Sequence, residues 1–185
     1  ISIVYVGSLS RLRGIDTFLE AVDHLPSKLK SNIRIDLYGS GDDEYISNII
    51  YRISQNSDLQ IFHHGRIPHN EIPVRAGKSD IAVSPLPPHK AYNVSSPAKI
   101  FEYLAMGLPV VASRIKPHKR ILEHKKNALL YDPSSTESFR TQLQYLIEDQ
   151  EMRQTFAKNA RSLSLNYSWE NRFSIVEDTL GLPNR

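Results

Sequence analysis

The chain has 185 residues, of which 40% are hydrophobic and 23% charged, a length and composition that suit one sizeable core. The absence of cysteine excludes disulfides and thiolate metal sites, and no apolar segment approaches the roughly 18 residues of a membrane-spanning helix. The net charge of +3 fits an anionic ligand or a membrane surface, but there is no run of lysine and arginine of the kind that binds nucleic acid.

The chain begins inside an apolar strand, at residues 1–6, with no initiator methionine and no preceding arm. A native N-terminus rarely lies within a core strand, so we expect the chain to be a domain of a longer protein. Further apolar segments predict strands at 33–38, 59–63, 81–84, 109–112 and 128–131. Helical spacing predicts helices at 15–25, 44–56, 70–76, 118–123, 136–148, 151–165 and 169–180. Trp169, Phe173 and Val176 form the expected packing stripe of the last helix.

The order of these elements determines the expected fold class. Strands alternate with helices at the spacing of βαβ units, which predicts a parallel sheet with helices on both faces. The fold class is therefore α/β, a Rossmann-like, doubly wound parallel sheet of about six strands. No internal repeat, low-complexity segment or interior linker divides the chain, so residues 1–185 are expected to form one domain.

A further short helix is predicted between the fourth and fifth strands. Ser96 is a suitable N-cap, and Pro97 fits the first helical position, where its missing N–H costs nothing. Gly107 suits the left-handed residue that ends such a helix. Spacing predicts that its buried stripe consists of Phe101, Leu104 and Ala105.

Lys99 occupies an unusual position in this helix. It lies in the first turn, against the positive end of the helix dipole, where an acidic residue would be favoured. It also precedes Glu102, which is the less favourable order for a helical ion pair. A bound anion, phosphate being the usual one, would explain a cation beside exposed helix N–H groups. A solvated surface lysine is the alternative interpretation.

Ligands of an open parallel sheet bind outside the carboxyl ends of the strands. The residues that follow the strands are mostly glycine, serine and basic residues, namely Gly7, Ser8, Arg11, Arg13 and Gly14, then Gly39, Ser40 and Gly41, then Gly65 and Arg66, then Ser95, Ser96 and Lys99. Glycine allows close approach of the backbone to a ligand, so this edge suits a diphosphate. Each piece alone has a plainer interpretation, as a tight turn or a solvated side chain. Together they favour a nucleotide-type anion.

Other catalytic patterns are absent from the sequence. The seven histidines are scattered and predict no metal site. No Gly-x-Ser-x-Gly elbow, Walker loop or His-Glu-x-x-His motif occurs. Tyr92, in the proline-rich loop before the short helix, is either a binding residue or simply an exposed loop aromatic.

Five segments resemble the C-terminal, donor-binding domain of GT-B fold glycosyltransferases of the family 4 type, the glycosyl transferases group 1. Residues 6–16, VGSLSRLRGID, resemble the first loop of that domain, and 79–85, SDIAVSP, resemble one of its strands. Residues 96–111, SPAKIFEYLAMGLPVV, are similar to its donor-site helix, which is a specific motif. Residues 127–133 and 167–169 match two later motifs, so the resemblance covers nearly the whole chain.

The resemblance implies roles for individual residues. Arg13 and Lys99 would be the catalytic cations, because Arg13 stands where the family usually has a lysine that stabilises the departing diphosphate. Glu102 matches the second glutamate of the family's E-x7-E pair, which usually holds the donor ribose. The remaining donor-binding positions would be Gly7, Ser8, Gly39, Gly65, Arg66, Ser95, Ser96 and Pro97.

Two positions depart from the family pattern. Ser8 replaces a family arginine, which removes one phosphate-binding cation, and Arg11 could compensate. Val94 replaces the first glutamate of the pair, the one that would contact the sugar. These departures leave the identity of the sugar and the details of transfer open. They also prompt the alternative of a degenerate GT-B domain that serves as a nucleotide-binding or scaffolding module.

The resemblance implies a retaining hexosyltransferase of polysaccharide biosynthesis, using a UDP- or GDP-sugar and neither cofactor nor metal. The acceptor, a glycan or a lipid-linked molecule, would bind to a separate N-terminal domain of the same protein. We expect the helix within residues 165–185 to pack toward that domain, and the isolated chain to be inactive. The expected location is the cytoplasm, with peripheral association at the inner membrane face if the acceptor is a lipid. A sugar-nucleotide epimerase or a receiver or flavodoxin-type domain fits the motifs less well.

Overall fold

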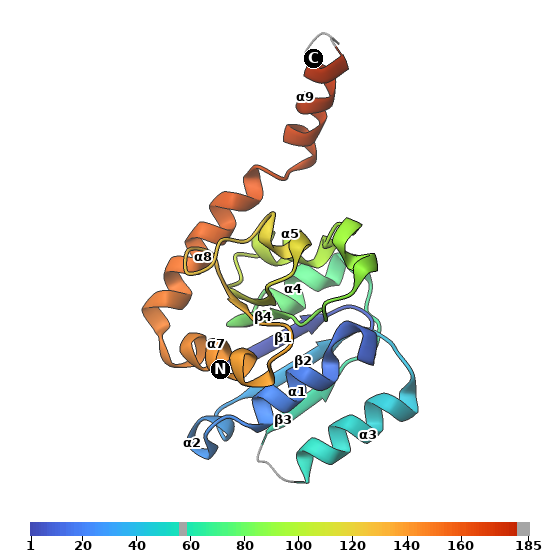
Figure 1. Cartoon of the computed structure of the whole chain (residues 1–185), viewed down its shortest axis with the longest axis vertical. Helices are drawn as coiled ribbons and strands as arrows, with labels where there is room; N and C mark the ends of the chain where they lie inside the picture. The colour runs from blue at the N-terminus through green and yellow to red at the C-terminus, as the bar shows by residue number, and fades with distance from the viewer. Residues whose placement is uncertain (56–58, 181–185) are drawn as a thin grey trace.

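Six short apolar segments form one parallel sheet in the computed structural model, which describes residues 1–55 and 59–180 (Figure 1). The strands are β1 Ser2–Val6, β2 Arg34–Tyr38, β3 Gln60–His63, β4 Ile81–Ser84, β5 Val110–Ser113 and β6 Ala128–Tyr131. Their spatial order is β3-β2-β1-β4-β5-β6, and every neighbouring pair is parallel. The predicted α/β fold with a six-stranded sheet is confirmed.

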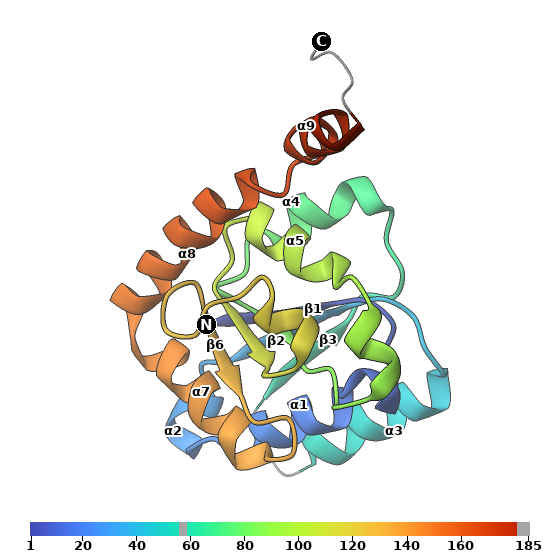
Figure 2. The same cartoon turned by 45° about the horizontal axis from the view of Figure 1, so that its top comes forward.

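Helices cover both faces of this sheet, as the two views in Figure 1 and Figure 2 show. One face carries α1 Ile15–Asp23, α3 Asp43–Ser54 and α7 Thr136–Glu148, and the other carries α4 Ile72–Ala76, α5 Ala98–Ala105 and α8 Gln150–Leu165. Shorter pieces connect them, namely η1 Arg11–Arg13, α2 Ser27–Lys30, η2 His69–Glu71, η3 Lys90–Val94 and α6 Lys116–Lys119. The last helix is α9 Trp169–Leu180.

In every strand except the edge strand β3, alternate residues enter two separate core layers. In β1, Ile3 and Tyr5 pack with the α1 layer, whereas Val4 and Val6 pack with the α5 layer. Side chains of a strand point alternately to the two faces, and a sheet covered on both sides needs apolar residues at every position. This explains why the central strands read as continuous apolar segments.

The site helix α5 differs in detail from the sequence prediction. It begins at Ala98, with Pro97 at the N-cap position, so Ser96 is not its N-cap, and no side chain caps it. Its buried residues are Ile100, Tyr103 and Leu104, whereas Ala105 is exposed and Phe101 only half-buried. The predicted and the observed buried residues both have helical spacing. The helix buries the observed set because Tyr103 is held in the core by contacts with the sheet.

Tyr103 ties α5 to the centre of the sheet. Its side chain is fully buried, and its hydroxyl accepts a hydrogen bond from the Val6 N–H at 2.9 Å. The same hydroxyl donates to the Val83 carbonyl at 3.4 Å. This one side chain therefore fixes α5 over the carboxyl ends of β1 and β4.

We expect Tyr103→Phe to lower the free energy of unfolding by about 1 to 3 kcal/mol, because the buried Val6 N–H loses its partner. Urea unfolding followed by circular dichroism measures this loss. Tyr51→Phe is the matched control, since Tyr51 is 65% exposed on α3. Equal stability of the two variants would contradict the anchoring role of the hydroxyl.

Several expected boundaries were wrong. Two short helices lie where no helix was expected, α2 between the helix expected at 15–25 and the strand at 33–38, and η1 between the first strand and that helix. The helix expected at 118–123 instead spans Lys116–Lys119, because Pro117 fits its first turn. The proline-rich loop ends in the 3-10 turn η3. These pieces are one or two turns long, too short for a periodic pattern to identify.

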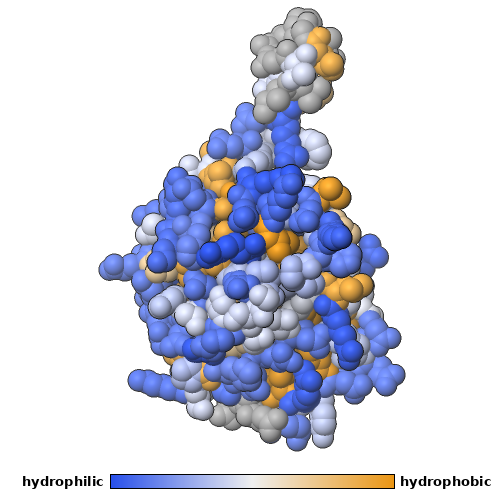
Figure 3. All heavy atoms as spheres, viewed as in Figure 1, coloured by the Kyte–Doolittle hydropathy of each residue, from blue (hydrophilic) through white to orange (hydrophobic). Residues whose placement is uncertain are grey.

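The helix α9 projects from the body of the molecule, and Figure 3 shows hydrophobic atoms on its surface. Trp169 and Phe173, expected to form a packing stripe, are 82% and 56% exposed. The side chain of Val176 and residues 181–185 lie outside the described part of the structure. At the base of α9, the Arg172 guanidinium lies over the ring of Phe101 in α5, 4.9 Å from its centroid. Trp169 and Phe173 are therefore not buried within this chain.

Candidate donor site

The strand order creates a crevice at the carboxyl ends of β1 and β4. From β1 the chain builds outward to β2 and β3, and from β4 it builds in the other direction to β5 and β6. Ligands bind at such a switch point in open α/β sheets. Two pockets of about 490 and 420 Å³ lie here, and they share Val6, Gly7, Ser8 and Ile72. We call them the Lys99 pocket and the Tyr38 pocket, respectively.

Nearly all the residues predicted for the site line these two pockets. The Lys99 pocket contains Arg13, Ser95, Ser96, Pro97, Lys99 and Glu102. The Tyr38 pocket contains Gly39 and Arg66, and both pockets contain Gly7 and Ser8. Gly65 lines neither pocket, but its carbonyl accepts a hydrogen bond from the Gly39 N–H at 2.8 Å. The fold thus brings four separate segments of the chain to one place.

Lys99 is not a solvated surface lysine. Its Nζ lies 3.9 Å from the centroid of the buried Tyr5 ring. A Cβ added to Gly7 would lie 2.9 Å from that nitrogen, so the ammonium packs directly against the Gly7 backbone. Burial, with a contribution from the nearby positive charge of Arg13, lowers the pKa of Lys99 to about 7. A bound anion would favour its charged form.

Arg13 reaches the same pocket from η1. Gly14, with φ of 74°, ends this turn in the left-handed conformation, and a Cβ there would lie 1.8 Å from the Pro85 carbonyl oxygen. The guanidinium lies over the Tyr92 ring, 5.7 Å from its centroid, and the Tyr92 hydroxyl donates to the Leu12 carbonyl at 2.6 Å. Tyr92 is therefore a half-buried residue that supports η1 rather than a free loop aromatic.

Glu102 lies at the boundary between α5 and η2. Its Oε1 is 3.1 Å from Nε2 of His69, which belongs to the Tyr38 pocket. The carboxylate therefore stands between the two pockets, where a hydroxyl-bearing group spanning them would meet it. In the described ranges, no group of three or more histidine, aspartate and glutamate residues could hold a metal ion.

The two departures from the family motif have different structural outcomes. Ser8 lines both pockets, so no cation occupies its position. Val94 is 88% exposed and lines neither pocket. The Lys99 pocket therefore has no carboxylate at the position that precedes Ser95.

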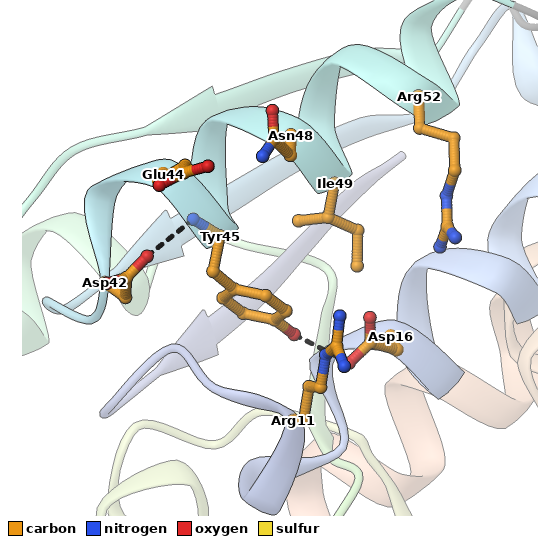
Figure 4. Close-up of a pocket in the computed structure, with 8 residues that line it drawn as sticks. All are labelled: Arg11, Asp16, Asp42, Glu44, Tyr45, Asn48, Ile49 and Arg52. Carbon is orange, nitrogen blue, oxygen red and sulfur yellow. Dashed lines mark hydrogen bonds between the residues drawn. The ribbon is translucent and has the colours of Figure 1, made fainter.

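Arg11 does not replace the missing cation at Ser8. It lines a separate pocket of about 400 Å³ between η1, α1 and α3, shown in Figure 4. Its guanidinium lies 5.8 Å from the centroid of the Tyr45 ring, whose hydroxyl donates to Asp16 at 2.8 Å. The expectation that Arg11 compensates for Ser8 is not supported by this geometry.

Sequence reasoning missed a polar cluster beneath the Tyr38 pocket. The rings of Tyr38 and His64 stack with centroids 4.4 Å apart, and His64 Nε2 lies 2.6 Å from the Asp36 carboxylate. Arg34 donates two hydrogen bonds to the same carboxylate, at 2.8 and 2.9 Å. Burial raises the pKa of Asp36, but its bonds to Arg34 and His64 outweigh this and lower it. The alternation Arg34-x-Asp36-x-Tyr38 on one face of a strand was the available signal.

A buried histidine supports the other side of the crevice. Nε2 of His118 lies 3.1 Å from Ser84 Oγ at the end of β4, and Nδ1 lies 2.8 Å from the Ser113 carbonyl at the end of β5. Burial lowers the pKa of His118 to about 4. The ring is therefore neutral near pH 7 and links the ends of two strands through hydrogen bonds.

The family model for "Glycosyl transferases group 1" matches residues 1–163. The lipopolysaccharide glucosyltransferase WaaG of Escherichia coli is 23% identical over 99% of this chain and 44% of its own length. The chain spans only 42 to 48% of the length of the curated relatives that it matches.

Two solved structures have the same fold. The C-terminal domain of the group 1 family protein LpcC from Francisella tularensis has a TM-score of 0.77 and 24% identity, covering 91% of this chain and 86% of that one. Anabaena HepE, in complex with UDP and glucose, has a TM-score of 0.78 and 19% identity, covering 98% and 48%. With the family model matching most of its length, the chain belongs to the glycosyl transferases group 1 family.

Proposed function

We propose that this chain is the donor-binding domain of a retaining glycosyltransferase. The donor is a nucleoside diphosphate sugar, a UDP- or GDP-sugar, and the acceptor is a glycan or a lipid-linked molecule. The observation that carries the proposal is the convergence of Arg13 and Lys99 on one pocket at the switch point, beside the start of α5. Membership of the family and the UDP in the HepE complex support it.

The chemistry follows from the position of the two cations. As the bond between the sugar and the diphosphate breaks, negative charge grows on the leaving oxygen. Lys99, held against Gly7, and Arg13, supported by Tyr92, are positioned in advance to stabilise that charge. Because the side chains are already fixed, little reorganisation accompanies the reaction.

The acceptor side of the site belongs to a separate N-terminal domain of the full-length protein in this proposal. The chain covers about half of its curated relatives, and α9 presents exposed Trp169 and Phe173 that such a domain would cover. The isolated chain would then bind nucleotide but transfer no sugar. The described part contains no helix long and apolar enough to cross a membrane. We place the protein in the cytoplasm, with the inner membrane face as its working surface for a lipid acceptor.

A degenerate GT-B domain, acting as a nucleotide-binding or scaffolding module, is the second candidate. Ser8 and Val94 favour it, since each removes a charged residue that the family motif contains. Turnover of donor sugar by the full-length protein distinguishes the two. Hydrolysis or transfer of a UDP- or GDP-sugar would establish the enzyme.

Glu102 provides the test of the donor site itself. We expect the chain to bind UDP or GDP in titration calorimetry, and Glu102→Ala to weaken this binding about tenfold, because a ribose hydroxyl loses a charged acceptor. The variant should bind the 2′-deoxynucleotide as tightly as the ribonucleotide. Glu151→Ala, at an exposed acid on α8, is the control that should change nothing. Unaltered ribose preference in Glu102→Ala would show that the nucleotide lies elsewhere.

A further inference from the structure

The connection between β5 and β6 is rich in positive charge. Residues 114–126, here called the basic segment, contain six lysine and arginine residues and one glutamate. Their formal charge of +5 exceeds the +3 of the whole chain. All six cationic residues are exposed, and they are Arg114, Lys116, Lys119, Arg120, Lys125 and Lys126.

The fold brings the two ends of this segment together along the outer edge of β6. Arg114 donates to the Leu130 carbonyl at 3.2 Å, and the Leu130 N–H donates to Nδ1 of His124 at 2.9 Å. Burial lowers the pKa of His124, and the positive charges of Arg114 and Lys125 lower it further. The cations from both ends of the segment are thus close enough to repel a third positive charge between them.

Specific contacts hold the segment in this shape. Asn159 of α8 donates to the Lys126 carbonyl at 2.6 Å, and the loop before β6 lies beside α8 in Figure 2. Lys125 has φ of 64° and donates its N–H to the Ala128 carbonyl at 2.9 Å. A left-handed backbone at a residue with a side chain is uncommon and needs such support. The positive surface is therefore preformed.

The charges are largely uncompensated. Among the described residues, Lys126 is the one cation of the segment within ion-pair distance of a carboxylate, Glu123, at 2.8 Å, and Arg114 acts on Asp132 only through its charge, which helps to lower the pKa of that carboxyl. None of the six lines the Lys99 pocket or the Tyr38 pocket. Keeping like charges close together without partners costs stability, so an anionic partner would relieve the repulsion.

We propose that the basic segment docks onto an anionic phospholipid bilayer. A bilayer offers negative charge spread over a surface, and lysine and arginine side chains near it bind without any shaped pocket. The segment contains no phenylalanine, tyrosine or tryptophan that could stack on a base, His118 is fully buried, and α6, its one helix, has four residues. It also lacks the aromatic anchors typical of protein interfaces. A bilayer is the anionic partner that needs none of these features.

Docking in this way would orient the donor site. Arg114, Lys116, Lys119 and Arg120 follow the carboxyl end of β5, which is the edge of the sheet that carries both pockets. A membrane in contact with them would bring that edge close to a lipid-borne acceptor. The inference deepens the membrane location of the proposed function by assigning it to the basic segment, and vesicle binding tests it separately from nucleotide binding.

Cosedimentation of the 185-residue chain with lipid vesicles tests the proposal. We expect binding to vesicles of phosphatidylcholine with phosphatidylglycerol, no binding to phosphatidylcholine alone, and loss of binding in salt of about 0.5 M, where screening is short-ranged. Lys116→Gln/Lys119→Gln should weaken binding about 10- to 30-fold. Lys28→Gln/Lys78→Gln is the matched control, because it removes the same charge from exposed sites on other elements.

Three results would overturn the proposal. One is equal binding to neutral and anionic vesicles, and another is an equal loss of binding in the test and control variants. The third is tighter, salt-sensitive binding to a short DNA or RNA duplex than to anionic vesicles, which would identify a nucleic acid as the partner. Because all four substituted lysines are exposed, neither variant should unfold at a lower temperature than wild type, and Lys116→Gln/Lys119→Gln should be at least as stable because it relieves repulsion.

Discussion

Lys99→Met is expected to weaken the binding of a nucleoside diphosphate about 10- to 100-fold at pH 6.5, while making the empty domain more stable. The loss follows from removing a charged donor that faces the pocket. The gain follows because methionine fills similar space against Tyr5 and Gly7 without burying a charge. We expect an increase of about 1 to 2 kcal/mol in the free energy of unfolding.

The lowered pKa of Lys99, about 7, adds a pH dependence with a definite sign. Below pH 7 the amine is already charged in the empty site. Above pH 7 the binding of a diphosphate is coupled to the uptake of a proton by Lys99. Affinity should therefore fall as the pH rises from 7 to 9, approaching tenfold per unit. Lys99→Met should show a flatter profile.

The stability of the empty domain should change in the opposite direction and rise with pH. The folded-state pKa of Lys99 lies below its unfolded value, so the unfolded chain holds more protons between about pH 7 and pH 10.5. This lysine therefore destabilises the fold most below pH 7, and its cost declines as the pH rises. Calorimetric titration and urea unfolding across this range measure both effects. Lys78→Met, at an exposed lysine, is the control, and a stable variant with unchanged affinity would refute the role of Lys99.

Gly39→Ala is expected to lower the free energy of unfolding by about 3 to 5 kcal/mol, enough to unfold much of the population of a marginal domain. Gly39 has φ of 144°, and an added Cβ would lie 1.9 Å from the Gly7 carbonyl oxygen. The turns that follow β1 and β2 cross at this point with no space between their backbones. Neither turn can move away, because Gly7 in turn packs against Lys99.

Gly65→Ala is the matched control for this variant. Gly65 also has a positive φ, of 65°, but an added Cβ would meet nothing within 4 Å. We expect it to lose only about 1 kcal/mol, the cost of the left-handed backbone alone. Denaturant titration compares the two directly. Similar losses for both would show that the crossing of the turns is not what requires Gly39.

The sequence predicted the sheet well because every strand except the edge strand β3 is largely buried. Continuous apolar segments such as β4 and β5 leave little choice of register or face. The sequence also identified the glycines at the carboxyl edge of the sheet, but it attributed them only to the approach of a ligand. Gly39 and Gly14 are required by neighbouring backbone, at Gly7 and Pro85, whatever ligand the edge binds.

The errors have a common physical origin in long-range contacts. Ile100, Tyr103 and Leu104 have the same spacing as the stripe predicted for α5, and the hydrogen bond from Val6 to Tyr103 decides between them. The direction of Arg11 depends on Tyr45 in α3. The basic segment escaped notice because its cations are interrupted in sequence and meet only when Arg114 and His124 join the edge of β6.

The contact between Arg172 and Phe101 couples the position of α9 to that of α5. Arg172 also lies 5.9 Å from the centroid of the Tyr167 ring, which packs on Phe101 at 4.9 Å between ring centroids. Phe101 is the residue before Glu102 and the second after Lys99, so α9 and the helix that carries both residues are joined at their surfaces. A rotation of α9 would press on the surface of α5 through Phe101, so a partner that holds α9 can alter the alignment of Lys99 and Glu102 in the candidate site.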